Sequence, residues 1–538
     1  MLASRFEPYN FSTMLIPRKH FVVLTLVFCS LAAFAQQPQH LFVRVTIGPK
    51  ITTPVSGRVL IFLTAGAGAK QVDENPFQPT AVYVAGRDVS DLASGSSVDV
   101  DTDDVAFPAG FSSLKPGDYE AQAVLDVNHD YNYQGRSPGD LISDVVFLTS
   151  FTPGQGAEPV FTLNDVVPAR ASKVESPEFE KNAHIEDFAS SALTGFSGRP
   201  IHVRAWIITP PDYLEHSKER YPTVYWTHGF GGGLNGAKYF GAMLFSLMEK
   251  KQVPPMIWVM LDESCPTGTH EFDNSVNNGP WGTALTAEFI PHLEKTYRMD
   301  GRPSGRFLQG HSSGGWATLQ LQIDYPAVFG GTWSTSPDPS DFHDFTGIDL
   351  YAPHANVYHR PDGTPYPIIR DHGKVIGTFE QFARNERVLG SYGGQIASFE
   401  WVFSPRGPDG RPVLMFDRNT GDVDPAVVAY WHDHHDLAHI VQTNWAQRGP
   451  ELRGKIHVFV GTADTFYLDG AAHKMDAVLK ALDADAHFTY IPDRTHFDLY
   501  TVYKQGGDPK GDRYGLFRQI GAEMYAVARP HANWKSAE

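Results

Sequence analysis

A serine between two glycines is the residue of this chain best placed to do chemistry. Residues 310–314 read Gly-His-Ser-Ser-Gly, which matches the G-x-S-x-G motif of a nucleophilic serine. An apolar strand pattern precedes the motif and a helical pattern at 315–324 follows it, so we expect a sharp strand-to-helix turn. Gly310 and Gly314 relieve crowding at such a turn, and the helix N-terminus favours negative charge. These features predict that Ser312 is a nucleophile.

A serine hydroxyl needs a general base, and the base needs a carboxylate that orients it. In chains with this motif the order is serine, acid, histidine. Asp464 follows a strand pattern at 456–460, and His496 follows a second one at 487–491. We therefore predict Asp464 as the orienting acid and His496 as the base, with Asp469 as the nearest competitor for the acid.

Acyl transfer also needs donors for the negative oxygen of the tetrahedral intermediate. The strand pattern at 223–227 runs into His-Gly-Phe-Gly-Gly-Gly at 228–233. A strand that ends in His-Gly and then glycines lets backbone N–H groups turn toward the substrate. We predict an oxyanion hole formed by the N–H groups of Phe230 and Ser313; a plain glycine-rich turn is the alternative.

These residues lie on a run of alternating strand and helix patterns from about 201 to 530. Several strand patterns are continuous apolar runs, as in parallel strands that are buried on both faces. The alternation predicts an α/β fold, the α/β-hydrolase fold with a mostly parallel, doubly wound sheet. Residues 337–452 interrupt this alternation of strands and helices. Because the segment is too long for an ordinary crossover connection, we expect it to form a lid-like insertion. Trp281, Trp333 and Asp338 are candidates for the border of the pocket, although core packing suits the tryptophans equally well.

The segment before this run has a different pattern. Short alternating strands separated by Gly, Pro, Asp and Ser predict a small all-β sandwich over 36–165. Residues 166–200 are polar and are expected to form an irregular linker. The β domain either braces the catalytic domain, which we favour, or binds carbohydrate.

Residues 1–35 resemble a secretory signal peptide. Basic residues precede an apolar run, and Ala-Phe-Ala at 33–35 fits a cleavage site after Ala35. We expect a secreted or periplasmic protein. Cys29 would leave with the signal, so Cys265 would be the single remaining cysteine. The net charge of −17 argues against nucleic acid or an anionic membrane as partner, and no later segment is apolar enough to span a bilayer.

Together, these motifs resemble the esterase D-like "putative esterase" family of α/β-hydrolases. That family includes feruloyl and acetyl-xylan esterases, S-formylglutathione hydrolases, enterochelin esterases and mycolyltransferases. The matching residues are the strand and glycine-rich loop at 220–232, the motif around Ser312, Gly-Thr-Ala-Asp at 461–464 and Thr-His at 495–496. The resemblance implies a serine esterase that acts on a small-molecule or carbohydrate-linked ester, with the nucleophile, acid and base at Ser312, Asp464 and His496. The insertion and the β domain depart from short family members, so substrate preference does not carry over.

Two patterns raise the question of metals. Asp126, Asn128 and Asp130 present oxygen atoms at alternate positions, as in a calcium loop, but a polar turn capped by its own side chains explains them better. The histidine-rich run at 431–439 lacks the flanking pattern of a zinc hydrolase. We predict no cofactor for the chemistry.

Three other functions use the same observations. An acyltransferase would have identical machinery and differ only in its acceptor site. An oligopeptidase would carry a propeller of several hundred residues, and no blade repeat is present. A carbohydrate-binding protein that merely kept the fold would have no need for the serine, acid, histidine and glycine loop in their expected order.

Overall fold

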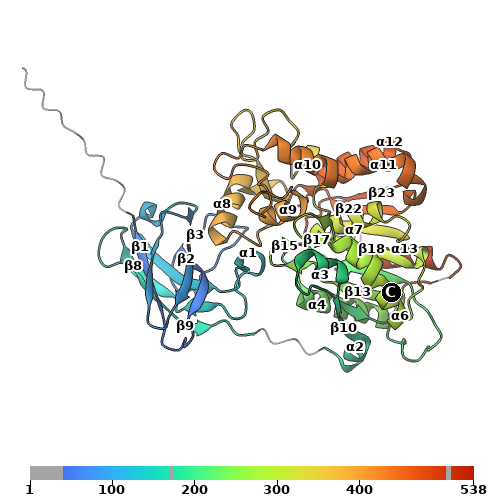
Figure 1. Cartoon of the computed structure of the whole chain (residues 1–538), viewed down its shortest axis with the longest axis horizontal. Coiled ribbons are helices and arrows are strands. Elements are labelled where there is room, and N and C mark those ends of the chain that lie inside the picture. Colours follow the sequence, from blue (N-terminus) through green and yellow to red (C-terminus); the bar gives the residue numbers. More distant parts are fainter. Residues whose placement is uncertain (1–39, 170–174, 504–510, 533, 538) are drawn as a thin grey trace, which may run out of the picture. The chain divides into compact units, whose positions relative to one another are not determined.

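The computed structural model describes residues 40–169, 175–503, 511–532 and 534–537. The predicted signal peptide at 1–35 lies outside the described residues. An eight-stranded sheet spans residues 183–491 (Figure 1), in the order β10-β11-β13-β12-β18-β19-β22-β23. The strands are β10 (Ala183–Ala189), β11 (His202–Ile208), β12 (Thr223–Thr227), β13 (Ile257–Leu261), β18 (Arg306–His311), β19 (Gly331–Thr335), β22 (Ile456–Gly461) and β23 (His487–Ile491). Both pairings of β11 are antiparallel and the pairings from β13 to β23 are parallel, which confirms the predicted α/β-hydrolase fold.

Helices pack against both faces of this sheet because strand side chains alternate. They are α4 (Leu234–Glu249), α6 (Ile290–Thr296), α7 (Ser313–Asp324), α12 (Leu468–Ala481) and α13 (Gly515–Ala528). Val224 and Trp226 of β12 share one apolar cluster with residues of α4 and α13. Tyr225, between them, joins a second cluster with residues of α6. Burial on both faces explains why the sequence of this strand is a continuous run without polar alternation.

The helical segment between Trp281 and Thr296 is interrupted. It consists of α5 (Trp281–Thr283), a π-helical segment (Ala284–Phe289) and α6. Pro291 lies in the first turn of α6 and has no N–H to donate to the preceding turn. The π-helical turn directly before it is a rare feature that occurs mostly as a single-turn bulge inside an α-helix.

Residues 166–200 are more regular than the sequence suggested. Ser176 caps α2 (Pro177–Asn182), β10 follows directly and pairs with β11, and α3 (Ser191–Ser197) leads into the sheet. The expectation of an irregular segment was wrong for this part. Because β10 is an edge strand with most of its side chains half-buried or exposed, its apolar periodicity is weak.

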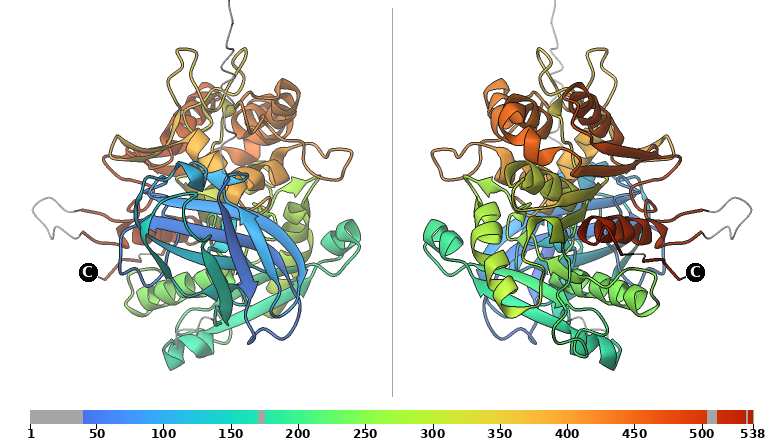
Figure 2. Two further views of the ribbon diagram at one scale, coloured as in Figure 1. Left: turned by 90° about the vertical axis from the view of Figure 1, so that its left-hand side faces the viewer. Right: turned by 90° about the vertical axis from the view of Figure 1, so that its right-hand side faces the viewer.

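The N-terminal strands form a separate nine-stranded sheet, drawn in blue to teal in Figure 2. They are β1 (Phe42–Ile47), β2 (Val55–Ala65), β3 (Val82–Leu92), β4 (Ser97–Asp101), β5 (Ala106–Phe107), β6 (Gly117–Asp126), β7 (Leu141–Ser143), β8 (Val146–Phe151) and β9 (Val160–Val166). Val59 and Ile61 of β2 pack in a cluster with residues of β1 and β9. Leu60 and Phe62 face the other way and pack with Val388. The second face of this sheet is therefore covered in part by the insertion.

The insertion between β19 and β22 has its own elements and core. They are the hairpin β20 (Pro367–Asp371) and β21 (Lys374–Thr378), followed by α8 (Phe379–Leu389), α9 (Gln395–Phe403), α10 (Pro425–His435) and α11 (Leu437–Leu452). A capping box of Thr378 and Gln381 starts α8. Buried side chains of the insertion form one apolar cluster with Trp316 of α7 and Met475 of α12. The insertion is thus packed against the sheet's own helices.

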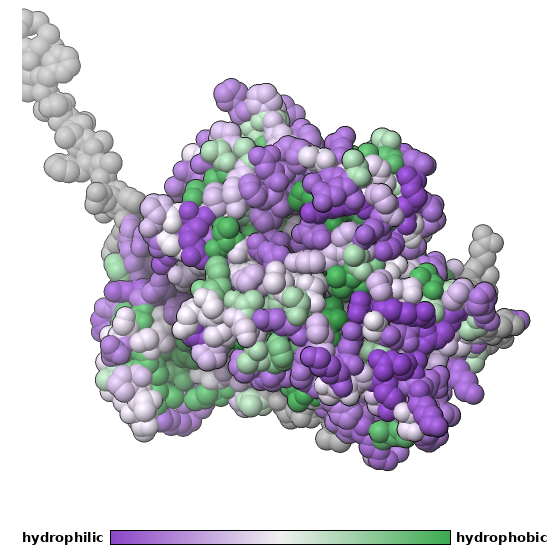
Figure 3. Space-filling view, turned by 45° about the vertical axis from the view of Figure 1, so that its right-hand side comes forward, coloured by the Kyte–Doolittle hydropathy of each residue, from purple (hydrophilic) through white to green (hydrophobic). Residues whose placement is uncertain are grey.

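Hydrophilic residues predominate on the face drawn in Figure 3, in keeping with the net charge of −17. In the described part of the chain, no helix has the length and apolar composition needed to cross a bilayer. Several large apolar side chains are nevertheless exposed, among them Phe77 (45%), Phe147 (47%) and Phe497 (65%). Phe77 and Phe497 also line a pocket.

Candidate active site

Ser312 occupies the turn between β18 and α7. Its φ of 61° and ψ of −124° lie in a region that non-glycine residues rarely adopt, and such strain is characteristic of functional turns. The N–H of Ser312 donates to Thr335 O at 3.1 Å, and its carbonyl accepts from Asp338 N at 3.2 Å. These bonds from the neighbouring strand and loop hold the strained turn in place.

The glycines of the motif are required by space. A Cβ on Gly310 would clash with the carbonyl of Gly314, and a Cβ on Gly314 would clash with the carbonyls of Thr227 and His228. Backbone atoms cannot move aside as a flexible side chain can, so alanine does not fit at either position. The motif thus brings β18, α7 and the end of β12 into close contact.

His496 and Asp464 meet beyond the ends of β23 and β22. His496 Nδ1 lies 2.9 Å from Asp464 Oδ2, and both side chains are buried. The other oxygen of Asp464 accepts N–H bonds from Phe466 (2.9 Å) and Leu468 (3.3 Å). Burial opposes the charged carboxylate, but His496 and the hydrogen bonds to Asp464 together outweigh burial and hold the pKa of Asp464 below its usual value. Asp469, the competing acid, instead pairs with Arg370 at 2.7 Å.

The glycine-rich loop after β12 lies against the serine turn. A Cβ on Gly229 would come within 2.9 Å of His311 O and 3.0 Å of Ser312 Cβ. Neither Phe230 N–H nor Ser313 N–H donates to another group of the described chain. Both predicted donors therefore remain available beside the serine.

Asp338 is the partner of the serine hydroxyl in this structure. Ser312 Oγ donates to Asp338 Oδ1 at 3.3 Å, and Ser313 Oγ donates to Asp338 Oδ2 at 3.0 Å. Burial raises the pKa of Asp338 to about 6, although His496 nearby and the two hydroxyls act against the rise. The sequence suggested Asp338 only as a border residue, and no local pattern points to a carboxyl group in contact with the serine.

Further carboxyl groups lie buried near Asp338, and sequence analysis missed them. Neither side-chain oxygen of Glu263 has a hydrogen-bond partner among the described residues, and burial raises the pKa of this carboxyl to about 8. Burial, with Asp338 and Glu263 close by, also raises the pKa of Glu271 well above its usual range. The one signal in the sequence is the acidic pair Asp262 and Glu263 directly after the apolar strand β13.

Two adjoining pockets open at this site. The smaller, about 50 Å³, is lined by Ser312 and Asp338 together with apolar side chains of the insertion. The larger, about 350 Å³, is lined by Phe230, Phe497 and residues of both the insertion and the N-terminal sheet. Phe382, Gln395 and Phe466 line both pockets. The N-terminal contribution was not foreseen from the sequence.

Comparison with protein families gives the site its context. The model of the family described as "Putative esterase" matches residues 197–506, which is more than half of the chain. The chain belongs to this esterase family. Hydrolysis of carboxylic esters is therefore the reaction class of this protein, and the matched region includes Ser312, Asp464 and His496.

The esterase is also similar to solved structures. A ferulic acid esterase matches with 13% identity and a TM-score of 0.38, over 64% of this chain and 97% of the other. An S-formylglutathione hydrolase from Agrobacterium tumefaciens matches with 12% identity and a TM-score of 0.34, over 64% of this chain and 94% of the other. A fluorophosphonate-binding serine hydrolase from Staphylococcus aureus matches with 10% identity and a TM-score of 0.36, over 64% and 98%.

The remaining sequence candidates lie apart from the serine of the esterase. Trp333 is buried and donates to Glu523 Oε2 at 2.7 Å, and Trp281 stacks on His270 with ring centroids 3.5 Å apart. Both are core residues. His432 and His439 lie on different helices, α10 and α11, and their rings are 3.8 Å apart. These histidines do not line either pocket described above.

In the segment from Asp126 to Asp130, side-chain oxygens accept hydrogen bonds from the segment's own backbone. Asp126 Oδ1 accepts the N–H groups of Asn128 and Asp130, both at 3.2 Å, and Asp126 Oδ2 accepts Tyr131 N–H at 3.1 Å. Asp126, Asp130 and Asp140 bring one oxygen each within 4.8 Å of one another. Since the N–H groups already occupy the oxygens of Asp126, the polar-turn alternative describes this loop better.

Proposed function

We propose that this protein is an exported serine esterase that works through an acyl-enzyme. Ser312 Oγ attacks the carbonyl carbon of the ester while His496 Nε2 takes the serine proton. Asp464 orients the ring by accepting the Nδ1–H and stabilises the imidazolium. The N–H groups of Phe230 and Ser313 receive the negative oxygen of the tetrahedral intermediate.

Collapse of that intermediate releases the alcohol, which takes the proton from His496. The acyl group remains on Ser312 Oγ. Water then attacks the acyl carbon, with His496 as base, and the carboxylic acid leaves as Ser312 regains its proton. One ester and one water thus give one acid and one alcohol. The Ser312 hydroxyl, which donates to Asp338 in this structure, must rotate toward His496 before attack.

One observation carries the proposal. Ser312 lies in a strained turn at the carboxyl end of the parallel strand β18. At the same edge of the sheet, the buried side chains of His496 and Asp464 form a pair in which Nδ1 and Oδ2 are 2.9 Å apart. In open α/β sheets, sites form at the carboxyl ends of the strands, where residues distant in sequence converge. We also propose that residues 1–35 direct export, that 36–165 and 201–530 are the accessory and catalytic domains, and that 337–452 is an insertion of the latter.

The test uses the chain from Gln36 onward and p-nitrophenyl acetate. We expect Ser312→Ala to lower kcat/KM by about 10⁴-fold, because the nucleophile is lost while the oxyanion donors remain. Ser246→Ala, on the outer helix α4, serves as the matched control and should hydrolyse like the wild type. A fluorophosphonate probe should label the peptide that contains Ser312 in the wild type alone. Equal rates for Ser312→Ala and the wild type would remove the proposal.

A further inference from the structure

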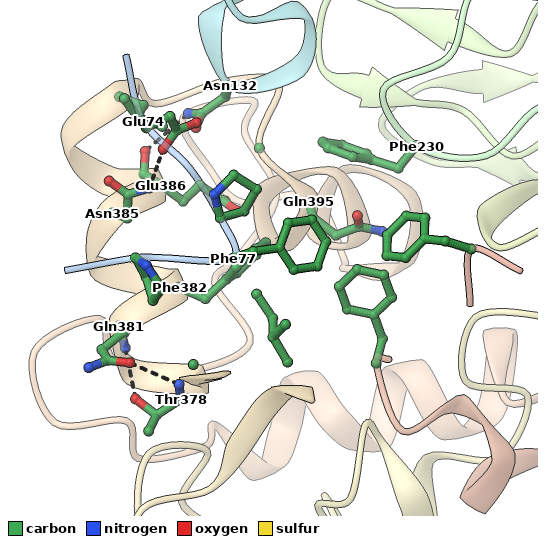
Figure 4. Close-up of a pocket in the computed structure, with 18 residues that line it drawn as sticks. Glu74, Phe77, Asn132, Phe230, Thr378, Gln381, Phe382, Asn385, Glu386 and Gln395 are labelled. Atoms are coloured by element: carbon green, nitrogen blue, oxygen red, sulfur yellow. Dashed lines mark hydrogen bonds between the residues drawn. The ribbon is translucent and has the colours of Figure 1, made fainter. Parts of the chain in front are cut away.

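The larger pocket is lined by stretches of the chain that lie far apart in the sequence (Figure 4). Phe230 comes from the loop after β12, and Phe497 directly follows His496. Phe382 comes from α8 of the insertion. Phe77 comes from the N-terminal sheet, on the loop between β2 and β3. Its ring meets the ring of Phe497 edge to face at 5.6 Å. Together with Phe466, five phenylalanine rings line one cavity of about 350 Å³.

The loop that carries Phe77 is fixed at several points. Ala69 N–H donates to Glu120 Oε1 at 2.9 Å, and Val72 N–H donates to Gln122 Oε1 at 3.1 Å, so β6 holds its first half. Asn385 of α8 donates to Glu74 at 2.5 Å, which ties its second half to the insertion. Hydrogen bonds on both sides hold this loop in place. A preorganised loop can bind a ligand without the entropy cost of becoming ordered on binding.

The smaller pocket lies next to Ser312, and the side chains that line it leave little free space. Phe345, Ile396 and Phe399 line it beside Ser312, and its volume is about 50 Å³. An apolar space of this size beside the nucleophile suits a short acyl chain, such as an acetyl group. A long or aromatic acyl group would require these buried side chains to move.

The position of His496 decides which part of the ester enters the larger pocket. The leaving alcohol takes its proton from His496 Nε2, so the alcohol part must lie on the histidine side of the ester. The rings of Phe466 and Phe497 contact the His496 ring, with centroids 5.0 and 5.5 Å away. Phe466 lines both pockets, but Phe497 lines the larger pocket and not the smaller one, so the larger pocket lies on the histidine side. The alcohol therefore faces the aromatic pocket, and the acyl group faces the small one.

We propose that this enzyme prefers esters that join a short acyl group to a bulky aromatic alcohol, and that Phe77 of the N-terminal sheet forms part of the alcohol subsite. This inference rests on the proposed serine esterase function. It makes the N-terminal sheet a determinant of specificity as well as a support. Edge-to-face contacts between aromatic rings supply the recognition, since Phe77 and Phe497 offer half-exposed rings to a planar group.

The first test compares ethyl acetate with naphthylmethyl acetate. Both release primary alcohols, so the two leaving groups differ little in basicity and mainly in size. We expect the wild type to favour naphthylmethyl acetate in kcat/KM, and Phe77→Ala to lower the ratio of the two kcat/KM values about tenfold or more. Phe147→Ala is the matched control, because Phe147 is an equally exposed phenylalanine of the same sheet that lines neither pocket. It should leave the ratio unchanged.

The second test lengthens the acyl group. With p-nitrophenyl esters we expect kcat/KM to fall at least tenfold from acetate to octanoate. An unchanged ratio in Phe77→Ala, or faster hydrolysis of the octanoate, would overturn the subsite assignment. Ser312→Ala separates this failure from failure of the proposed function. If Ser312→Ala still cleaves ethyl acetate, the nucleophile is wrong; if it is inert while Phe77→Ala keeps the wild-type ratio, only the subsite is wrong.

Discussion

Three buried carboxyl groups are concentrated behind Ser312. Glu263 and Glu271 are fully buried, and Asp338 nearly so. An isolated buried carboxylate is costly, so such groups hold their proton to a higher pH than usual. With a pKa of about 8, Glu263 keeps its proton at pH 7, whereas Asp338, with a pKa of about 6, is mostly ionised there.

Glu263 makes the fold sensitive to alkaline pH. Burial raises its pKa from 4.5 to about 8, so the folded state binds a proton that the unfolded chain has lost. Stability contributed by this group is present below about pH 4.5 and disappears as the pH rises through 8. Glu263→Gln stays neutral at every pH. We expect the melting temperature of the wild type to fall more between pH 5 and pH 9 than that of Glu263→Gln, by a few degrees, or roughly 2–4 kcal/mol. Parallel curves for both proteins would show that Glu263 does not titrate in this way.

The short helix α1 (Tyr131–Gln134) links the N-terminal sheet to the loop that carries Phe230, the proposed oxyanion donor. The Tyr133 ring meets the Phe230 ring edge to face at 4.9 Å. Asn132 Nδ2 donates to the carbonyls of Glu386 and Gly390, both at 3.0 Å. One helical turn thus contacts both the oxyanion loop and the insertion, and these contacts support a bracing role for the N-terminal sheet.

We expect Tyr133→Ala to lower kcat for p-nitrophenyl acetate about 10- to 100-fold. Without the ring, Phe230 loses the contact that fixes its backbone, and small displacements of a catalytic donor are costly. Tyr133→Phe is the matched variant. The Tyr133 hydroxyl is buried without a hydrogen-bond partner in the described structure, so its removal should preserve activity. Circular dichroism checks that both variants fold, and similar kcat values for the two would contradict the positioning role.

Strands with a strong apolar side-chain pattern could be predicted from the sequence, and strands with a weak pattern could not. The strands at Thr223–Thr227 and His487–Ile491 match their predicted bounds because local side-chain patterns mark their ends. The edge strand β10 was missed, since exposure weakens the apolar signal on which the prediction depends. For the candidate site, the order of serine, acid and histidine was legible along the chain. Asp338 was predicted at the border of the pocket, where it lies, but its contact with Ser312 and the burial of Glu263 were not predicted, because they depend on packing between distant segments.

At the scale of the whole molecule, the N-terminal sheet and the insertion share one cluster of buried residues. Leu60 and Phe62 of β2 pack with Val388 and Leu389 of α8. Arg58, also buried, donates to Val388 O at 2.8 Å. The sequence suggested an accessory module joined by a linker. Contacts between residues more than 300 positions apart produce no periodic pattern in the sequence. The packing of β2 against α8 could therefore not be predicted.

We expect one cooperative thermal transition for the chain from Gln36 onward. Melting the N-terminal sheet would expose apolar side chains of α8 and so destabilise the insertion with it. Differential scanning calorimetry measures the number of unfolding transitions directly. Activity on p-nitrophenyl acetate should be lost over the same temperature range. Two separate peaks, with activity surviving the first, would show that the sheets unfold independently.

The shared packing of β2 and α8 has a consequence for how the protein is made. The N-terminal sheet leaves the ribosome first, yet Val388 follows Arg58 by 330 residues. At about 5–20 residues per second, roughly 15–65 s pass before its covering helix exists. During that interval an apolar strand face is open to water and to other nascent chains. Slower growth or a chaperone that shields this face should therefore raise the yield of active protein more than changes near Ser312.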